Sequence, residues 1–163
     1  MKAVATTILC LTSIMAASAS ADGALVATLE SLKVSRAADG SEQLAPSYHA
    51  QPNDVFEYRA TYRNQSSKTM RRVIATVPVP QGFEYVAESA APVVMLASLD
   101  GKTFSPLPLI RAVPSADGAA NETPIPAQEL RFLRWEIGDM QAGTSSTVTA
   151  RVRFAPTTTT ASD

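Results

Sequence analysis

Residues 54–64 read DVFEYRATYRN, and this stretch decides the fold class. Phe56, Tyr58, Ala60 and Tyr62 occupy alternate positions, and the residues between them are charged or polar. Successive side chains of a β-strand point to opposite faces, so this period-two pattern predicts a strand with one buried face and one solvated face. Strands of this kind belong to antiparallel sheets.

The same alternation recurs on both sides of this stretch, and no helix-period segment follows residue 21. The expected strands, besides 54–64, cover residues 25–36, 70–77, 83–88, 93–99, 104–109, 130–137 and 148–154. Eight short strands separated by turn signals predict an all-β, immunoglobulin-like antiparallel β-sandwich of about seven to eight strands. Its expected core residues are Phe56, Tyr58, Tyr62, Val77, Trp135, Ile137 and Val152.

The segments between the expected strands contain turn residues. Residues 37–53 are expected to form a loop with a turn at Asp39-Gly40, and residues 111–128, with three prolines, a long surface loop. Asp100-Gly101 predicts a hairpin turn, because both residues tolerate a positive φ. Two prolines within 104–109 place that strand at a sheet edge. In the first strand, the apolar positions change parity after residue 29, which predicts a bulge or a switch between sheets.

The N-terminal segment has the pattern of a cleavable secretory signal. Lys2 precedes a short apolar stretch, and the small residues Ala19 and Ala21 predict cleavage before Asp22. A buried N-terminal helix is the alternative. Removal of 21 of the 163 residues would leave 142, one ordinary domain, with a net charge of −2 instead of −1. It would also remove Cys10, the one cysteine, so the mature chain would contain no thiol or disulfide.

This interpretation divides the chain into a signal peptide (1–21), a sandwich domain (22–155) and a disordered threonine-rich tail (156–163). It places the mature protein in the periplasm or outside the cell. Charges of both signs are interspersed along the chain, so we expect no nucleic acid partner. The apolar stretch near the N-terminus is too short to remain in a bilayer, so we expect no membrane-spanning segment.

Four blocks in order resemble the bacterial conserved-repeat family catalogued as domain of unknown function eleven. They are QPNDVFEY (51–58) with YRN (62–64), VPVPQGFEYV (77–86) with Ser89, SLDGKTF (98–104), and RWEIG (134–138) with Gly143 and the closing strand. The first block has Asn53 where that family usually has glycine. The resemblance implies an immunoglobulin-like sandwich found in exported and surface bacterial proteins, without a general catalytic assignment. A short chain with one module and no anchor departs from the repeat stalks in which such domains often occur.

The sequence contains no catalytic or metal-binding constellation, so we expect neither an enzyme nor a cofactor. His49 is the one histidine and lies in a polar segment, which disfavours both nucleophilic catalysis and zinc. Calcium would require separate turn aspartates to converge, and turn formation explains each of them; they are Asp54, Asp100, Asp117 and Asp139. A glycosidase-type carboxylate pair among Glu57, Glu84 and Glu88 stays open, because such pairs meet only in space.

Three functions therefore stand beside one another. The first is a binding module for a protein or cell-envelope partner, and the candidate partner edge is the first strand with Leu25, Leu29 and Leu32. The second is a filament or adhesin subunit that assembles by strand addition, with residues 22–36 inserted into a neighbouring copy. Edge-strand pairing would also allow a homo-oligomer. The third is a carbohydrate-binding or enzyme-accessory domain, which requires an exposed Tyr85 or Tyr48.

Overall fold

The computed structural model describes residues 24–47, 49–114 and 120–155. The regular secondary structure of this part of the chain consists of strands and one short 3-10 helix. The elements are β1 (Leu25–Arg36), β2 (Glu42–Pro46), β3 (Val55–Asn64), β4 (Met70–Pro78), β5 (Phe83–Tyr85), β6 (Leu96–Ser98), β7 (Ser105–Pro106), β8 (Ile110–Pro114), β9 (Ala120–Pro124), η1 (Ala127–Glu129), β10 (Phe132–Met140) and β11 (Ser145–Phe154).

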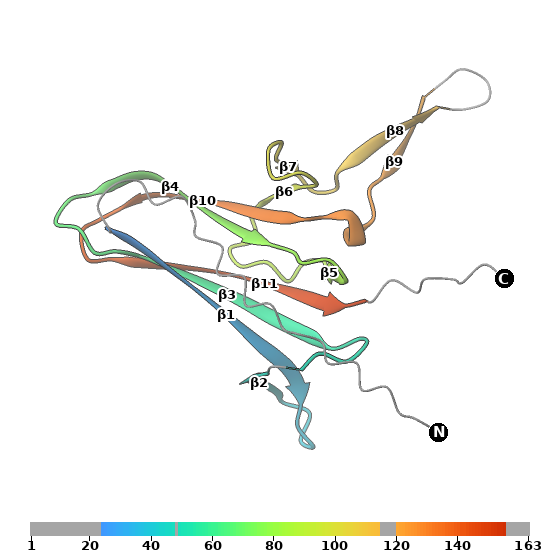
Figure 1. Ribbon diagram of the computed structural model, residues 1–163, viewed down its shortest axis with the longest axis horizontal. Coiled ribbons are helices and arrows are strands. Elements are labelled where there is room, and N and C mark those ends of the chain that lie inside the picture. Colours follow the sequence, from blue (N-terminus) through green and yellow to red (C-terminus); the bar gives the residue numbers. More distant parts are fainter. Residues whose placement is uncertain (1–23, 48, 115–119, 156–163) are drawn as a thin grey trace, which may run out of the picture.

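Two antiparallel sheets pack face to face, which confirms the predicted all-β, immunoglobulin-like sandwich. The five-stranded sheet has the order β2-β1-β3-β11-β5, and the four-stranded sheet has the order β4-β10-β6-β7. Figure 1 shows them as two layers, with β4 and β10 above β3 and β11. All eight strands expected from the sequence are present, and β2, β8 and β9 are additional.

The core lies between β3 and β11 of one sheet and β4 and β10 of the other. Five of the seven expected core residues are buried in it: Phe56, Tyr62, Val77, Trp135 and Val152. Tyr58 and Ile137 are half-buried and pack against the core from its margins, so their expected place in its interior was wrong. Tyr58 lies opposite Ser31 of β1, and Ile137 lines an open groove described below.

Two expectations about the first strand and its connection were also wrong. Residues 37–53 are not only a loop, because β2 pairs with the second half of β1 after a turn in which Gly40 has a φ of +84°. The pairing of β1 with β3 is continuous from Leu25↔Asn64 to Val34↔Val55, without a bulge or a sheet switch. The parity change instead marks a change of face: Leu29 lies on the inner face opposite Ala60, whereas Val34 lies on the outer face opposite Val55 and Leu44.

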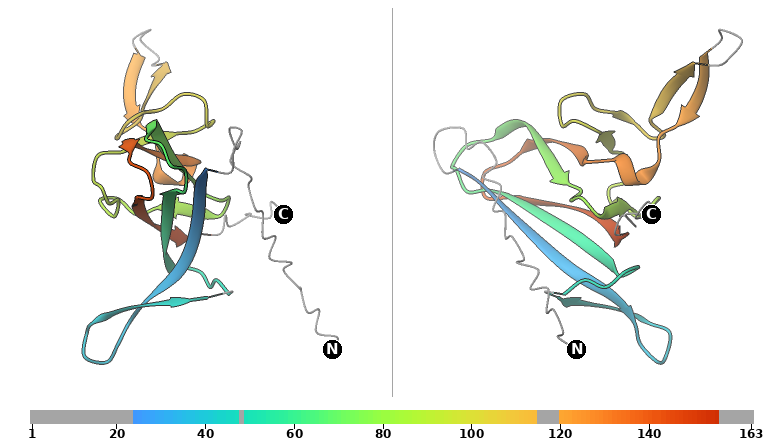
Figure 2. Two further views of the ribbon diagram at one scale, coloured as in Figure 1. Left: turned by 90° about the vertical axis from the view of Figure 1, so that its left-hand side faces the viewer. Right: turned by 45° about the vertical axis from the view of Figure 1, so that its right-hand side comes forward.

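The expected long loop at 111–128 forms a β-hairpin. β8 and β9 pair from Ile110↔Pro124 to Pro114↔Ala120 and project away from the sandwich (Figures 1 and 2). Two of the three prolines that suggested a loop, Pro114 and Pro124, are the last residues of these strands, where a missing backbone N–H interrupts little of the ladder, and Pro126 precedes η1. Asp117-Gly118 lies outside the described residues.

Two strands of the four-stranded sheet are shorter than the sequence predicted. The strand expected at 93–99 is reduced to β6 (Leu96–Ser98), and the one expected at 104–109 to β7. β7 lies at the end of the sheet order, which confirms its predicted edge position. β10 continues to Met140, with a register shift on either side of Gly138.

The expected signal peptide with Ala19, Ala21 and Asp22, and the tail from residue 156, lie outside the described residues. Within the described residues, no helix has the length and apolar character needed to cross a membrane.

Candidate functional site

The first candidate site is the outer edge of β1. β2 pairs only with its second half, from Leu32↔Pro46 to Arg36↔Glu42. The first half, Leu25–Ser31, has β3 on one side and no described strand on the other. We call this segment the β1 edge. Of the three residues named for the candidate partner edge, Leu25 and Leu29 lie on this segment, whereas Leu32 is paired with β2 and does not belong to it.

The inner face of the β1 edge is apolar and uncovered. Leu25 and Leu29 lie opposite Asn64 and Ala60, both buried, and yet are 38% and 51% exposed. The five-stranded sheet therefore extends beyond the strands of the opposite sheet that would cover these leucines. The edge offers two features together: backbone groups without a neighbouring strand, and apolar side chains directed toward the open margin of the core.

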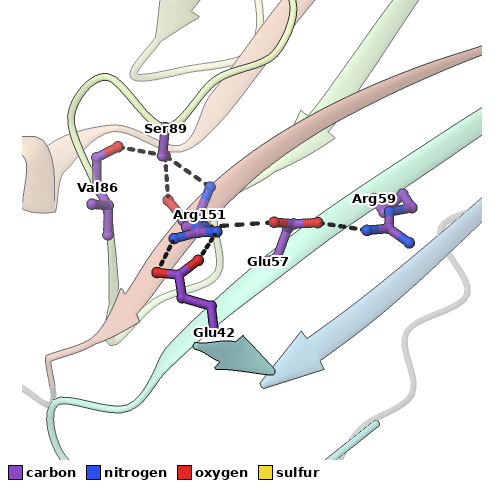
Figure 3. A network of polar contacts seen from close by, with 6 residues as sticks. All are labelled: Glu42, Glu57, Arg59, Val86, Ser89 and Arg151. Atoms are coloured by element: carbon purple, nitrogen blue, oxygen red, sulfur yellow. Dashed lines mark hydrogen bonds and ion pairs between the residues drawn. The ribbon is translucent and has the colours of Figure 1, made fainter. Parts of the chain in front are cut away.

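A polar network on the outer face holds β2 in place (Figure 3). Arg151 of β11 donates from Nη1 and Nη2 to the two carboxylate oxygens of Glu42, at 3.1 and 2.8 Å. Glu57 lies between two cations, with Arg151 Nε at 3.5 Å and Arg59 Nη2 at 2.8 Å. The hydrogen bond from Arg151 lowers the pKa of Glu42. This network anchors the start of β2. The free edge begins beyond the other end of β2, where Pro46 lies opposite Leu32.

An ion pair fixes the end of the β1–β3 ladder at which β3 begins. Lys33 Nζ donates to Asp54 Oδ2 at 2.7 Å, and the backbone N–H of Gln51 donates to the same oxygen at 2.8 Å. Both interactions lower the pKa of Asp54, the lysine contact more than the backbone contact. Asp54 thus fixes the start of β3 against β1.

The second candidate site is a groove of about 450 Å³ between β10, β11 and residues 92–96, which we call the Trp135 groove. Its lining includes four consecutive residues of β10, from Arg134 to Ile137. Because neighbouring side chains of a strand point to opposite faces, a groove that contacts four in succession runs along the edge of the strand. β6 covers this edge of β10 only as far as Arg134, opposite Leu96.

Hydrogen bonds hold residues 86–92 in place, and these residues lead to the groove wall opposite β10. Ser89 Oγ accepts from the backbone N–H of Arg151 at 2.9 Å and donates to the carbonyl of Val86 at 2.6 Å (Figure 3). Ala91 exchanges two backbone hydrogen bonds with Thr149. The indole Nε1 of Trp135 then donates to the carbonyl of Pro92 at 2.8 Å. This chain of contacts carries residues 86–92 along β11 and then over to β10.

The rim of the Trp135 groove contains the most exposed large apolar side chains in the described part of the chain. Val93 and Val94 are 83% and 86% exposed. The sequence pattern placed both within a strand, where one of each neighbouring pair would be covered. In the structure the chain leaves the sheet at these residues, so both valines face solvent and Val94 lines the groove.

Arg134 lines the same groove and has no acidic partner among the described residues. Its guanidinium carbon lies 3.3 Å from the centroid of the Phe104 ring. Its Nε is buried and makes no hydrogen bond within the described part of the chain. Buried polar groups are normally hydrogen-bonded, so Nε is an exception, but its burial puts it out of reach of a ligand. A ligand would meet the terminal Nη1 and Nη2, which are not among the buried atoms and have no acceptor within the described residues. No sequence pattern marked this residue, because it occupies an ordinary solvent-facing position of a strand.

The residues considered for catalysis or metal binding do not converge. Asp54, Asp100 and Asp139 each accept hydrogen bonds within their own surroundings, from Gln51 and Lys33, from Ser98, Lys102 and Thr103, and from Arg72, respectively. No group of three or more metal-ligating His, Cys, Asp or Glu side chains occurs within residues 24–47, 49–114 and 120–155. His49 is exposed, and Asp117 lies outside the described residues.

The candidate carboxylates and the candidate aromatic platform have structural partners instead. Glu57 is paired with Arg59 and Arg151, and the buried Glu84 accepts from Arg153 Nε at 2.6 Å and contacts Gln128. The third candidate carboxylate, Glu88, stands out only by its backbone, which has a positive φ of 61°. Tyr85 is only 6% exposed, so it provides no surface on which a sugar can stack, and its expected role was wrong. Tyr48 lies outside the described residues.

In comparisons with known proteins, the chain matches no family model, and neither the curated proteins nor the solved structures give a match. The resemblance to domain of unknown function eleven therefore stays a prediction.

Proposed function

We propose that this chain is an exported, non-catalytic binding module that captures an extended segment of a partner protein by strand addition at the β1 edge. The observation that carries the proposal is the incomplete cover of β1: β2 pairs with Leu32–Arg36 and leaves Leu25–Ser31 without a neighbour. The signal pattern in residues 1–21 supports export.

Backbone and side chains at the β1 edge favour the same kind of partner. Unpaired N–H and C=O groups at a sheet edge bind an incoming strand through main-chain hydrogen bonds, and pockets for alternate side chains supply specificity. Leu25 and Leu29 share the inner face. The preferred partner is therefore a strand with apolar residues at alternate positions, which would cover both leucines and extend the five-stranded sheet.

The pairing of β1 favours this function over the filament hypothesis. In that hypothesis residues 22–36 leave their own domain and enter a neighbouring copy. In the structure β1 pairs with β3 over ten residues, from Leu25 to Val34. Donation of β1 would break this ladder, whereas acceptance of a strand at its free edge keeps it.

The test uses a photo-crosslinking amino acid at Thr28, in the middle of the β1 edge, in cells that produce the protein. The captured partner is identified by mass spectrometry, purified, and titrated against the purified mature chain. We expect Leu29→Lys to weaken binding at least tenfold, because an inward-pointing charge on an edge strand opposes strand addition.

Ile74→Lys is the matched control, since Ile74 is 48% exposed on β4 and Leu29 is 51% exposed on β1. Equal loss of affinity in the two variants, or none in either, would show that the β1 edge is not the binding site. Capture of a second copy of the chain, with a concentration-dependent dimer in light scattering, would replace the partner protein by a homo-oligomer. Turnover of a hydrolase substrate by the purified chain would contradict a non-catalytic function.

A further inference from the structure

We infer that the Trp135 groove is a second, independent binding site, which takes an apolar peptide segment carrying a single carboxylate that pairs with Arg134. The site lies outside the β1 edge, and its existence does not depend on strand addition there.

The apolar part of the inference follows from the lining. Met95, Leu96, Trp135, Ile137 and Val148 give the groove an apolar surface. Val93 and Val94 stand exposed at its rim. Burial of such side chains by a ligand is favourable at roughly 25 cal/mol per Å² of apolar surface removed from water. Adjacent exposed valines beside an apolar groove are typical of a contact surface rather than of a monomer's free surface.

The carboxylate follows from Arg134. Arginine holds planar carboxylates through paired N–H donors, and stacking on an aromatic ring fixes the plane of its guanidinium. Arg134 is stacked on Phe104 in this way, and its terminal Nη1 and Nη2, unlike the buried Nε, can be reached from the groove and have no acceptor among the described residues. The arginine is therefore held in position while its two terminal nitrogens remain free to bind a carboxylate.

The number of acidic groups follows from Glu136. This exposed side chain lies two residues from Arg134 on the same strand and lines the same groove. A second acidic group on the ligand would meet Glu136 and be repelled. The groove therefore suits one carboxylate flanked by apolar residues and disfavours a polyanion.

The extended peptide follows from the path of the groove. It runs along the edge of β10 from Arg134 to Ile137. β4 lies on one side, and on the other side β6 pairs only as far as Arg134, so no described strand covers residues 135–137 there. A peptide can use the backbone groups of this edge as well as its apolar lining. A fatty acid would use only the lining and Arg134, which gives the test a clear alternative.

Trp135 provides the measurement, because it is the one tryptophan of the chain and lines the groove. The probes are the capped hexapeptide acetyl-Ser-Val-Glu-Val-Ser-Val-amide and its counterpart with Gln in place of Glu. Each is titrated into the mature chain while the tryptophan emission is recorded. We expect the Glu peptide to bind at least tenfold more tightly than the Gln peptide.

Variants assign this preference to Arg134. We expect Arg134→Met to bind both peptides equally weakly, whereas Arg63→Met, at an exposed arginine of β3, keeps the preference. If Arg134→Met does not fold, Val94→Asp serves in its place. Its site is 86% exposed, and the added charge should weaken the Glu peptide more than the Gln peptide.

Three outcomes would overturn the inference. They are an unchanged tryptophan emission with both peptides up to millimolar concentration, equal affinity for Glu and Gln, and an undiminished preference in Arg134→Met. Binding of decanoate without binding of either peptide would assign the groove to a fatty acid and would also overturn it. Because Arg134→Met and Val94→Asp lie outside the β1 edge, failure here is distinguishable from failure of the proposed strand addition.

Discussion

Glu42 of β2 and Arg151 of β11 are joined by two hydrogen bonds, although β1 and β3 lie between their strands in the sheet. The pair fastens the end strand of the five-stranded sheet to β11, three positions away in the strand order. We expect Glu42→Gln to loosen β2 while the sandwich stays folded, because the remaining pairing of β2 is with β1 alone. Hydrogen exchange followed by mass spectrometry should then show faster exchange in residues 43–45, with unchanged protection of β3.

Glu129→Gln is the control for this prediction, since Glu129 also pairs with an arginine, Arg111, at an exposed site. It should leave exchange in β2 unchanged. The same reasoning predicts a pH dependence. Arg151 lowers the pKa of Glu42 in the folded state, so the contribution of the pair is present above the ordinary value of 4.5 and is lost as the pH falls through the folded-state pKa. An undiminished protection factor of β2, relative to the intrinsic exchange rate at each pH, well below that point would contradict the assignment.

Ionisation of the Tyr58 phenol should destabilise the folded protein at high pH. Burial raises its pKa to about 12 from the ordinary value of 10.0. The folded state therefore favours the neutral phenol, and its contribution to stability is full below pH 10 and is lost as the pH rises toward 12. Denaturant unfolding at pH 9 and at pH 11 should show this loss in the native chain, and Tyr58→Phe should reduce it. An equal loss in both proteins would assign the effect to other groups.

The side chain of Leu133 should contribute strongly to the stability of the core. It is fully buried on β10, and its replacement by alanine leaves a cavity between the sheets. We expect Leu133→Ala to lower the free energy of unfolding by about 2–5 kcal/mol. Ile74→Ala, on the outer face of the neighbouring strand β4 and 48% exposed, should change it by less than about 1 kcal/mol. Urea denaturation of the three proteins measures both values.

The strands that alternate strictly were predictable, because one physical cause decides them. In β3, β4 and β11 the apolar face meets the core directly, so the period-two pattern and the burial agree. The pattern was misleading where a strand lacks a covering sheet. β1 carries apolar residues on opposite faces of its two halves, and only pairing partners reveal that Leu29 faces an uncovered margin.

The three additional strands escaped prediction because none of them has a buried face. All residues of β2, β8 and β9 are exposed, so no alternation marks them. The candidate sites were predictable only in part. The β1 edge followed from the apolar residues of the first strand, whereas its limit depends on where β2 ends, at Pro46 opposite Leu32. Arg134 and Phe104 are thirty residues apart in the sequence, and their stacking has no local signature.

The signal pattern predicts the start of the mature protein. If the chain is exported, mass spectrometry of the protein from its native compartment should find Asp22 as the first residue and no free thiol, because Cys10 is removed. Ala19→Arg should block this cleavage, since signal peptidases require small residues there. Recovery of the full-length chain from the cytoplasm, with Met1 or Lys2 as its first residue, would contradict export.

The turn at Gly101 should be far less tolerant of substitution than the turn at Gly40, although both glycines have a positive φ. Gly101 and Gly40 have φ angles of +74° and +84°, a region that costs an L-residue about 1–2 kcal/mol. A Cβ at Gly101 would lie 2.9 Å from Cε2 of Phe132, whereas no atom lies within 4 Å of one at Gly40. Gly40→Ala should therefore cost only the backbone term, and Gly101→Ala should cost that term plus displacement of the Phe132 ring. The free energies of unfolding should differ accordingly, and a double variant with Phe132→Leu should recover part of the loss at Gly101. Equal losses in the two single variants would mean that the Phe132 ring moves aside without cost.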